Sequence, residues 1–319
     1  MSDLTVKETA ALLRQMDDVL ILTHVRPDGD TVGCASALCL ALRALGKRAY
    51  LLPNPGQTRT TAPYFAPCEA PEGFAPKYVV STDIAALGLL PDNAQPYRDR
   101  IDLAIDHHPS FERFAKANIV RPEAAACGEL IYDILCQLGP VTAETALPLY
   151  VAVSTDTGCF QYSNTTPSTH RVAAALMETG IDFRAVNKIF FRTKSRKRMA
   201  LEGDMLANME FYDEGRVAVL KVPISLMERV GADESDAEDL SALGGQIEGV
   251  DCAVTMRELR PDVWKFSVRT GERINACSVC ARLGGGGHAA AAGATVSGTL
   301  EEARTAVLDA IRAVQETGG

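Results

Sequence analysis

Histidine and aspartate side chains gather at four places along the chain, and each place lies at or near the end of an apolar stretch. The first is THVRPDGD (residues 23–30), which follows the strand-like run VLIL. The later ones fall in YVVSTD, LAIDHHP and the helix-like LYVAVSTDTG. Together they supply His24, Asp28, Asp30, Asp83, Asp106, His107, His108 and Asp156. Such side chains can bind divalent metal ions or move protons, so their positions in the fold decide which chemistry is open to them.

Taken singly, each cluster has an ordinary structural explanation, because an aspartate can cap the helix that follows it and a histidine can pack against a neighbour. Four clusters at corresponding positions favour a functional interpretation. The carboxyl ends of the strands in an open parallel sheet share one edge, and ligands bind in the crevice there. We therefore expect these distant segments to converge on one site.

The residue types at this expected site favour a pair of divalent metal ions. Crowded carboxylates repel one another and take up protons unless cations compensate them. Two divalent ions would balance the four carboxylates of Asp28, Asp30, Asp83 and Asp156. The accompanying imidazoles of His24 and His107 favour Mn²⁺, with Mg²⁺ as the alternative. Two metals about 4 Å apart can stabilise both the attacking and the leaving oxygen of a phosphoryl displacement.

The elements that must position these residues read as an α/β fold. Strand-like runs at residues 19–22, 49–52, 78–81, 101–105 and 118–120 alternate with helix-like runs at 31–46, 127–138 and 142–154. This alternation predicts a parallel sheet with helices on both faces. After residue 206, strand-like runs at 216–222, 252–259 and 264–270 and a capping-box pattern at 299–302 predict a smaller α+β domain. The expected organisation is a catalytic domain (1–185), a helical linker (186–205) and a second domain (206–319).

The second domain carries a glycine-rich segment that fits an anionic ligand. Gly284–Gly287 let a backbone approach phosphate closely and present its N–H groups, and His288 adds a side-chain donor. Four glycines alone would indicate only a flexible loop. Beside the expected metal site, the segment is more consistent with substrate binding.

Composition limits the classes of partner. The chain has 319 residues and a formal net charge of −9, which argues against coating long or duplex nucleic acid. The first residues, MSDLTVKETA, lack a basic region followed by an apolar core, so we expect no secretory signal. No apolar run reaches the roughly 18 residues that a membrane helix needs, and the nine scattered cysteines suit a reducing cytoplasm. The basic run RTKSRKR (192–198), the pair Cys277/Cys280 and His170 are interpreted as structural.

The succession of motifs resembles that of the DHH phosphoesterase superfamily. HVRPDGD, Asp83, the Asp-His-His triplet at 106–108 and Asp156 look like its successive motifs. GGGGH followed by AAAAG (284–293) looks like the motif of its associated substrate-binding domain. The resemblance covers nearly the whole chain. Cys34 stands where members of the family commonly have serine, and we expect it to affect packing more than chemistry.

The resemblance implies a role for each residue. One metal would be bound by His24, Asp28 and Asp83, and the other by Asp30, Asp83, His107 and Asp156, so that Asp83 bridges. His108 would act on the substrate as an electrophile or proton donor, with support from Asp106. The residues implied to hold the substrate are Arg257, Arg269, Asn275, Gly285, Gly286, Gly287 and His288.

The implied activity is metal-dependent phosphoester hydrolysis in a cleft between the domains. The expected substrates are short single-stranded RNA oligomers and linear dinucleotides such as pApA and pGpG, and also 3′-phosphoadenosine 5′-phosphate. Two alternatives stay open. One is a catalytically idle protein that binds nucleotides or nucleic acid, and the other is a phosphohydrolase resembling the family's inorganic pyrophosphatases. A homodimer is compatible with the sequence.

Overall fold

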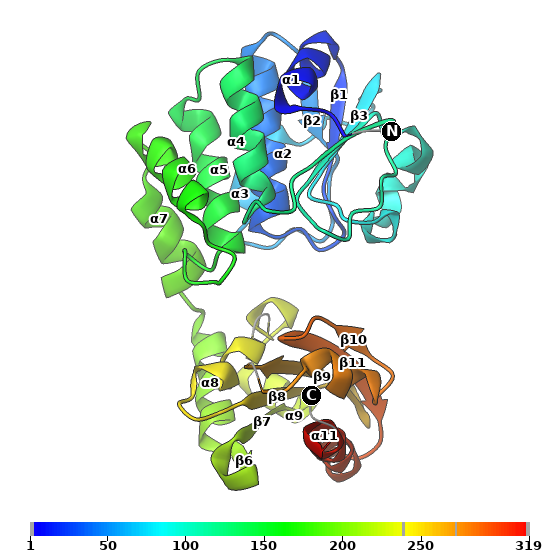
Figure 1. Cartoon of the computed structure of the whole chain (residues 1–319), viewed down its shortest axis with the longest axis vertical. Coiled ribbons are helices and arrows are strands. Elements are labelled where there is room, and N and C mark those ends of the chain that lie inside the picture. The colour runs from blue at the N-terminus through cyan, green and yellow to red at the C-terminus, as the bar shows by residue number, and fades with distance from the viewer. Residues whose placement is uncertain (1–2, 238–239, 272, 317–319) are drawn as a thin grey trace. The chain divides into compact units, whose positions relative to one another are not determined.

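The computed structural model describes residues 3–237, 240–271 and 273–316, and the chain divides into two compact units, Met1–Thr193 and Lys194–Gly319 (Figure 1). The boundary falls inside the segment expected to be a helical linker. That segment comprises the helix α7 (Phe183–Asn187), a π-helical turn (Lys188–Arg192) and the helix α8 (Arg196–Ala207).

The first unit is built on a five-stranded parallel sheet in the order β2-β1-β3-β4-β5. The strands are β1 (Val19–Leu22), β2 (Ala49–Leu51), β3 (Tyr78–Thr82), β4 (Leu103–Asp106) and β5 (Ala117–Val120). This confirms the expected α/β class. All residues of β1 are buried, as is usual for a parallel sheet covered on both faces.

Successive residues of β1 enter different cores, because side chains alternate between the faces of a strand. Val19 and Ile21 pack in a core with the α-helices, whereas Leu20 and Leu22 pack in a second core beneath short 3₁₀ helices. The helices of the first core include α1 (Val6–Gln15), α2 (Gly29–Ala44), α4 (Cys127–Leu138), α5 (Ala143–Asp156) and α6 (Pro167–Glu178). The 3₁₀ helices are Leu87–Leu89 and Asp92–Arg100.

The second unit contains a six-stranded mixed sheet in the order β10-β11-β9-β8-β7-β6. Its strands are β6 (Glu210–Tyr212), β7 (Val217–Val222), β8 (Cys252–Arg260), β9 (Val263–Thr270), β10 (Gly286–Gly287) and β11 (Ala291–Ser297). The helices α10 (Ala276–Ala281) and α11 (Leu300–Glu316) cover one face, and α8 and α9 (Ile224–Val230) pack in the core on the other. The expected α+β class is confirmed.

The helix α8 belongs to the second unit by its packing. Its residues Leu201 and Met205 are buried against Leu220 of β7. The basic run continues into α8, and both Lys194, just before the helix, and Arg198, within it, form ion pairs of 2.7 Å with Glu202 of α8. These charges are partly balanced within the helix. In the part of the chain that the structure describes, no helix has both the length and the apolar character needed to cross a bilayer.

The contact between α2 and α5 yields a prediction about stability. A Cβ atom on Gly33 would lie 2.3 Å from the backbone oxygen of Pro148 and 2.8 Å from the Cβ of Ala152. We expect Gly33→Ala to lower the free energy of unfolding by about 1–3 kcal/mol, because a helix backbone cannot yield as a side chain does. Chemical denaturation measures the change. Gly88→Ala is the matched control, since a Cβ there meets nothing within 4 Å; an equal effect of both substitutions would contradict the explanation.

Candidate functional site

The strand order of the first unit brings the predicted residues together. The strands β1, β3 and β4 are neighbours in the sheet, so their carboxyl ends lie side by side. The segments that follow these ends carry His24, Asp83 and His107, and the last residue of α5 is Asp156. His107 Nε2 lies 3.5 Å from Asp83 Oδ1, 3.6 Å from Asp156 Oδ2 and 3.8 Å from Asp30 Oδ2. Four segments expected to converge therefore meet around one imidazole.

The side chains form three overlapping groups that could hold a metal ion. In each group, one ligand atom from every member lies within 4.8 Å of the others. The groups are His24/Asp28/Asp83, Asp30/His107/Asp156 and Asp83/His107/His108. The first group is the set implied for one metal. The second contains three of the four residues implied for the other metal, and the fourth, Asp83, lies in the first and third groups.

Asp83 occupies an unusual position at the end of β3. Its backbone φ is +57°, in the left-handed region, and its side chain is almost fully buried. Its Oδ1 accepts no hydrogen bond from the described residues, although a buried carboxylate oxygen normally has a partner. An oxygen held in this way suits a metal ligand.

Asp28 and Asp30 are held by two different helix N-termini. Asp28 caps α2, with its Oδ1 accepting from the backbone N–H groups of Asp30 at 3.0 Å and Thr31 at 3.1 Å. Asp30 is itself buried and accepts from the N–H groups of Cys127 at 2.7 Å and Gly128 at 3.0 Å, which begin α4. Helix N-termini favour negative charge, so these hydrogen bonds favour the anionic form of both carboxylates. For Asp30, burial and the neighbouring carboxylates outweigh them.

Cys34, which we expected to affect packing more than chemistry, is fully buried and also has a polar contact. Its thiol lies 3.1 Å from Asp30 Oδ1 and donates to it. The two residues are four positions apart on α2 and therefore share one face of the helix. The four-residue spacing was visible in the sequence. The burial of Cys34, which leaves Asp30 as the acceptor for its thiol, was not.

The two neighbouring histidines have different partners. His107 Nδ1 lies 3.0 Å from the carbonyl oxygen of Ala124, so a neutral ring donates from Nδ1 and leaves Nε2 free to bind a metal. His108 Nδ1 lies 2.8 Å from Asp106 Oδ1, which also accepts the His108 backbone N–H at 2.6 Å. The hydrogen bond with Asp106 raises the pKa of His108, which favours the protonated, donating form. No pattern in the sequence predicted the contact between His107 and Ala124.

The electrostatics of the site call for cations. Burial, followed by the charges of Asp156 and Asp28, holds the pKa of Asp30 well above its usual value. Burial and the neighbouring Asp30 do the same to the pKa of Asp83. Burial also raises the pKa of Asp156. The carboxylates would thus take up protons unless positive charge entered the site, and their oxygens together with free imidazole nitrogens are suitable donors for Mn²⁺ or Mg²⁺.

In the second unit, three of the predicted substrate residues lie at one end of the sheet. Arg269 pairs with Ala291 across β9 and β11, and Ala291 is hydrogen-bonded to His288 in the turn that joins β10 to β11. Asn275 caps α10 by accepting from the Ser278 N–H at 3.1 Å. Its oxygen therefore has a structural partner, while His288 is exposed.

The glycine-rich segment is partly a packing device. A Cβ on Gly285 would lie 2.1 Å from the oxygen of Gly293, and one on Gly287 would lie 2.7 Å from the oxygen of Ala291. Both glycines are thus required by the close approach of β11. Gly286 is exposed with open space around it, so its backbone remains approachable.

Arg257 lies farther along the sheet and has an acidic partner. It stands opposite Lys265 on β9, on the same face as Arg269 because the two β9 positions are four residues apart. Its guanidinium forms an ion pair with Glu234, while its Nε is buried without a partner in the described structure. A phosphate would have to compete with Glu234 for this arginine.

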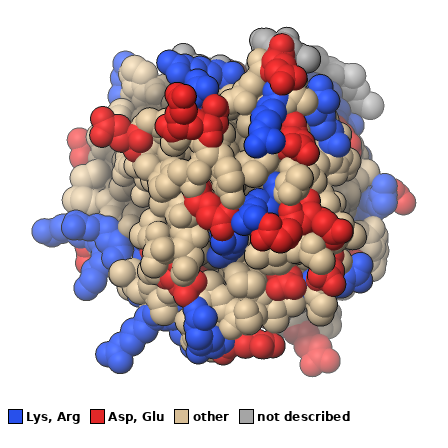
Figure 2. Space-filling view, turned by 90° about the horizontal axis from the view of Figure 1, so that it is seen from below, with Lys and Arg blue, Asp and Glu red and all other residues tan. Residues whose placement is uncertain are grey.

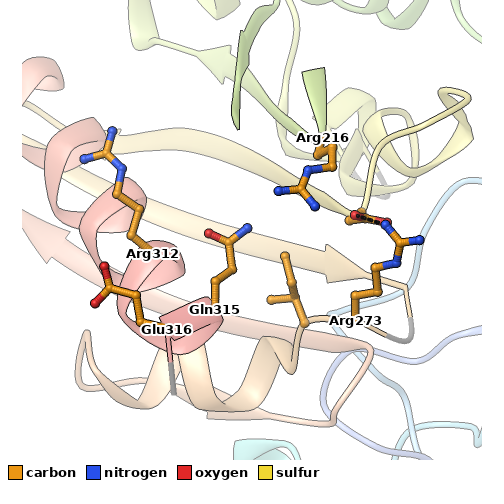
Figure 3. Close-up of a pocket in the computed structure, with 7 residues that line it drawn as sticks. Arg216, Arg273, Arg312, Gln315 and Glu316 are labelled. Atoms are coloured by element: carbon orange, nitrogen blue, oxygen red, sulfur yellow. Dashed lines mark hydrogen bonds and ion pairs between the residues drawn. The ribbon is translucent and has the colours of Figure 1, made fainter. Parts of the chain in front are cut away.

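A separate pocket in the second unit involves none of the predicted residues. It is lined by Arg216, Asp251, Arg273, Ile274, Arg312, Gln315 and Glu316 (Figure 3). Each arginine has an acidic partner, at 2.9 Å for Arg216 and Asp213, 3.3 Å for Arg273 and Asp251, and 3.0 Å for Arg312 and Asp309. Basic and acidic side chains are likewise interspersed on the face shown in Figure 2, which presents no broad basic surface.

Comparison with known proteins agrees with both units. Residues 18–153 match the DHH family, N-terminal domain, and residues 215–317 match the DHHA1 domain. The chain is 35% identical to the "Bifunctional oligoribonuclease and PAP phosphatase NrnA" of Thermus thermophilus, covering 92% of this chain and 89% of that protein. The NrnA protein of Bacillus subtilis is 24% identical, with 88% of this chain and 90% of the relative covered.

Solved structures show the same fold. An exopolyphosphatase-related protein from Bacteroides fragilis superposes with a TM-score of 0.88 at 23% identity, over 98% of this chain and 96% of that one. The RecJ protein from Thermus thermophilus superposes with a TM-score of 0.57 at 14% identity, over 98% of this chain and 55% of the larger RecJ chain. The chain belongs to the DHH family and joins its N-terminal domain to a DHHA1 domain.

Proposed function

We propose that this protein is a two-metal phosphoesterase that uses Mn²⁺ and hydrolyses short single-stranded RNA and linear dinucleotides to mononucleotides. It also converts 3′-phosphoadenosine 5′-phosphate to AMP. The observation that carries the proposal is the buried, unpartnered Asp83 Oδ1, with Asp83 shared between overlapping sets of ligand atoms. The relatives named as bifunctional oligoribonucleases and PAP phosphatases support the choice of substrate.

The proposed ligands are those that the sequence motifs imply, and the grouping of their ligand atoms supports the proposal. His24 and Asp28 would hold one ion, Asp30, His107 and Asp156 the other, and Asp83 both. When bound, the ions supply charge stabilisation for the attacking and leaving oxygens of the phosphoryl group. The protein fixes its ligands through hydrogen bonds to backbone groups, as between His107 Nδ1 and Ala124.

His108 is proposed to donate a proton to the leaving oxygen. Its Nδ1 is held by Asp106, so its Nε2 is the ring nitrogen left for the substrate. Its side chain is 42% exposed, in contrast to 13% for His107. The exposed imidazole is accessible to substrate, and the buried one is suited to metal.

The DHHA1 domain is proposed to bind the part of the oligonucleotide that does not react. Arg269 and His288 supply the donors for its phosphates. The acidic chain offers little basic surface for the many phosphates of a long strand, which favours short substrates. A pyrophosphatase would have little use for such a nucleotide-binding domain, and an idle binding protein would not need all six metal ligands.

Hydrolysis of pApA tests the function directly. We expect the Mn²⁺-loaded protein to release AMP, and Asp83→Asn to bind fewer than two Mn²⁺ per chain and lose more than about 100-fold in rate. Loss of outer-sphere partners already costs about 10–100-fold. Asparagine tolerates the positive φ of this position, so the substitution removes the ligand charge without adding backbone strain. Asp92→Asn, on the exposed surface of the same unit, is the control. No release of AMP by the loaded parent would refute the proposal.

Substitutions of the two histidines should have different effects on the amount of Mn²⁺ bound. His108→Ala is expected to retain two Mn²⁺ yet lose on the order of 10²-fold or more in kcat, as is typical when a general acid is removed. His107→Ala should lose Mn²⁺ because its Nε2 is a proposed ligand of one of the two ions. Equilibrium dialysis and single-turnover kinetics measure the two effects. Metal loss in His108→Ala with retention in His107→Ala would reverse the assignment.

Substrate discrimination tests the role of the DHHA1 domain. Arg269→Ala should lower kcat/KM for pApA by roughly 10- to 100-fold, because a charge-assisted hydrogen bond contributes about 1.5–3 kcal/mol. Hydrolysis of an aryl phosphodiester should change little, since that substrate has no second nucleotide to bind. Arg312→Ala, an exposed arginine of the same domain, is the control. Equal losses on both substrates, or faster cleavage of a 24-mer than of pApA by the parent, would contradict this role.

A further inference from the structure

The carboxylate of Asp30 accepts hydrogen bonds from three donors, which are divided unequally between its two oxygens. Oδ1 accepts from the Cys34 thiol at 3.1 Å and from the Gly128 N–H at 3.0 Å. Among the described residues, Oδ2 accepts only from the Cys127 N–H at 2.7 Å, and it is the oxygen that lies 3.8 Å from His107 Nε2. One oxygen is thus bound twice by the protein, and the other faces the cluster of ligand atoms.

We propose that Cys34 is a positioning residue that, together with the N-terminus of α4, anchors Asp30 Oδ1 so that only Oδ2 is presented to the metal. The inference rests on the proposed metal centre. It assigns a role to a cysteine that coordinates no metal itself and stands outside the set of predicted ligands.

The terminal torsion of an aspartate explains why such an anchor matters. Rotation about χ2 is broad and roughly two-fold, so a carboxylate without fixed donors can present either oxygen, or both. The two N–H groups of α4 approach from one side, and Cys34 approaches from the next turn of α2, the helix that carries Asp30. Cys34 has no solvent exposure, so water is excluded from replacing the thiol as a donor. Although a thiol is a weak donor, its acceptor here is an anionic oxygen.

Titration of the metal-stripped protein with Mn²⁺ alone tests the proposal without any catalytic readout. We expect Cys34→Ala to weaken the affected Mn²⁺ site by about tenfold, within the range seen when an outer-sphere partner is lost. Cys34→Ser restores a donor at the same position, and its affinity should lie within about threefold of the parent. The two variants differ in that serine can donate a hydrogen bond to Asp30 and alanine cannot. A difference in Mn²⁺ affinity between them therefore reports the hydrogen bond rather than the volume of the side chain.

Cys39 supplies a matched control within the same helix. It is equally buried, and its thiol donates to a backbone oxygen, that of Ala49, at 3.1 Å. Cys39→Ala should therefore lower the thermal stability of the metal-free protein by an amount similar to Cys34→Ala, yet leave both Mn²⁺ affinities unchanged. A purely structural role for Cys34 would make the two alanine variants alike in both measurements.

The possible outcomes are distinct. Parental Mn²⁺ affinity in Cys34→Ala, or equal weakening in Cys34→Ala and Cys34→Ser, overturns the inference. A parent that binds fewer than two Mn²⁺ contradicts the proposed metal centre instead, independently of Cys34. Should Cys34→Ala fail to fold, Cys34→Thr and Cys34→Val make the same comparison at nearly constant volume, and equal Mn²⁺ affinities in that pair would also overturn it.

Discussion

The mutual repulsion of buried carboxylates at one edge of a parallel sheet governs the architecture of the first unit. Asp30, Asp83 and Asp106 are almost completely removed from solvent and lie close to one another. In the described structure Asp30 receives three donors and Asp106 Oδ1 receives two from His108, but Asp83 Oδ1 and Asp106 Oδ2 receive none. Burying charged carboxylates without partners raises the free energy of the folded protein. Cations bound at the site would offset this increase.

The helices around the site stabilise some of its carboxylates and destabilise another. Asp28 and Asp30 lie at the N-termini of α2 and α4, where the partial positive charge of a helix favours carboxylates. Asp156 is the last residue of α5, where the helix end is negative and disfavours an anion. His107 lies beside it and is shared with two other aspartates. The position of Asp156 thus adds to the demand for positive charge.

The second unit shows how structural and binding roles overlap in one segment. Gly285 and Gly287 are glycines because β11 passes too close for a Cβ, whereas a Cβ on Gly284 or Gly286 would meet nothing within 4 Å. Asn275 uses its oxygen to cap α10, which leaves its amide nitrogen as the group that can donate to a substrate. Arg257 is engaged by Glu234. A substrate phosphate that bound Arg257 would therefore have to replace its contact with Glu234. Arg269 is the arginine beside the turn that carries His288.

The sequence alone determined the local elements and the residue types of the site. Apolar runs bounded by polar clusters located β1, β3 and β4, and the helix α4 was predicted at residues 127–138, the range observed. The helix α2 begins two residues earlier than expected, because Asp28 serves as its cap as well as a proposed ligand. The short strands β6 and β10 and the seven-residue strand β11 were not predicted, since they are held by pairing with neighbours that no local pattern records.

Tertiary structure alone decided how the site residues are held. Spacing indicated that Asp30 and His107 meet, but not that the amides of α4 bind Asp30, that Ala124 selects the ring nitrogen of His107, or that Cys34 donates to Asp30. These contacts join residues as many as 98 positions apart, such as Asp30 and Gly128. Composition and periodicity report which face of an element is buried; the identity of the atom that meets a given oxygen depends on how separate elements pack, and that is settled only when the whole chain has folded.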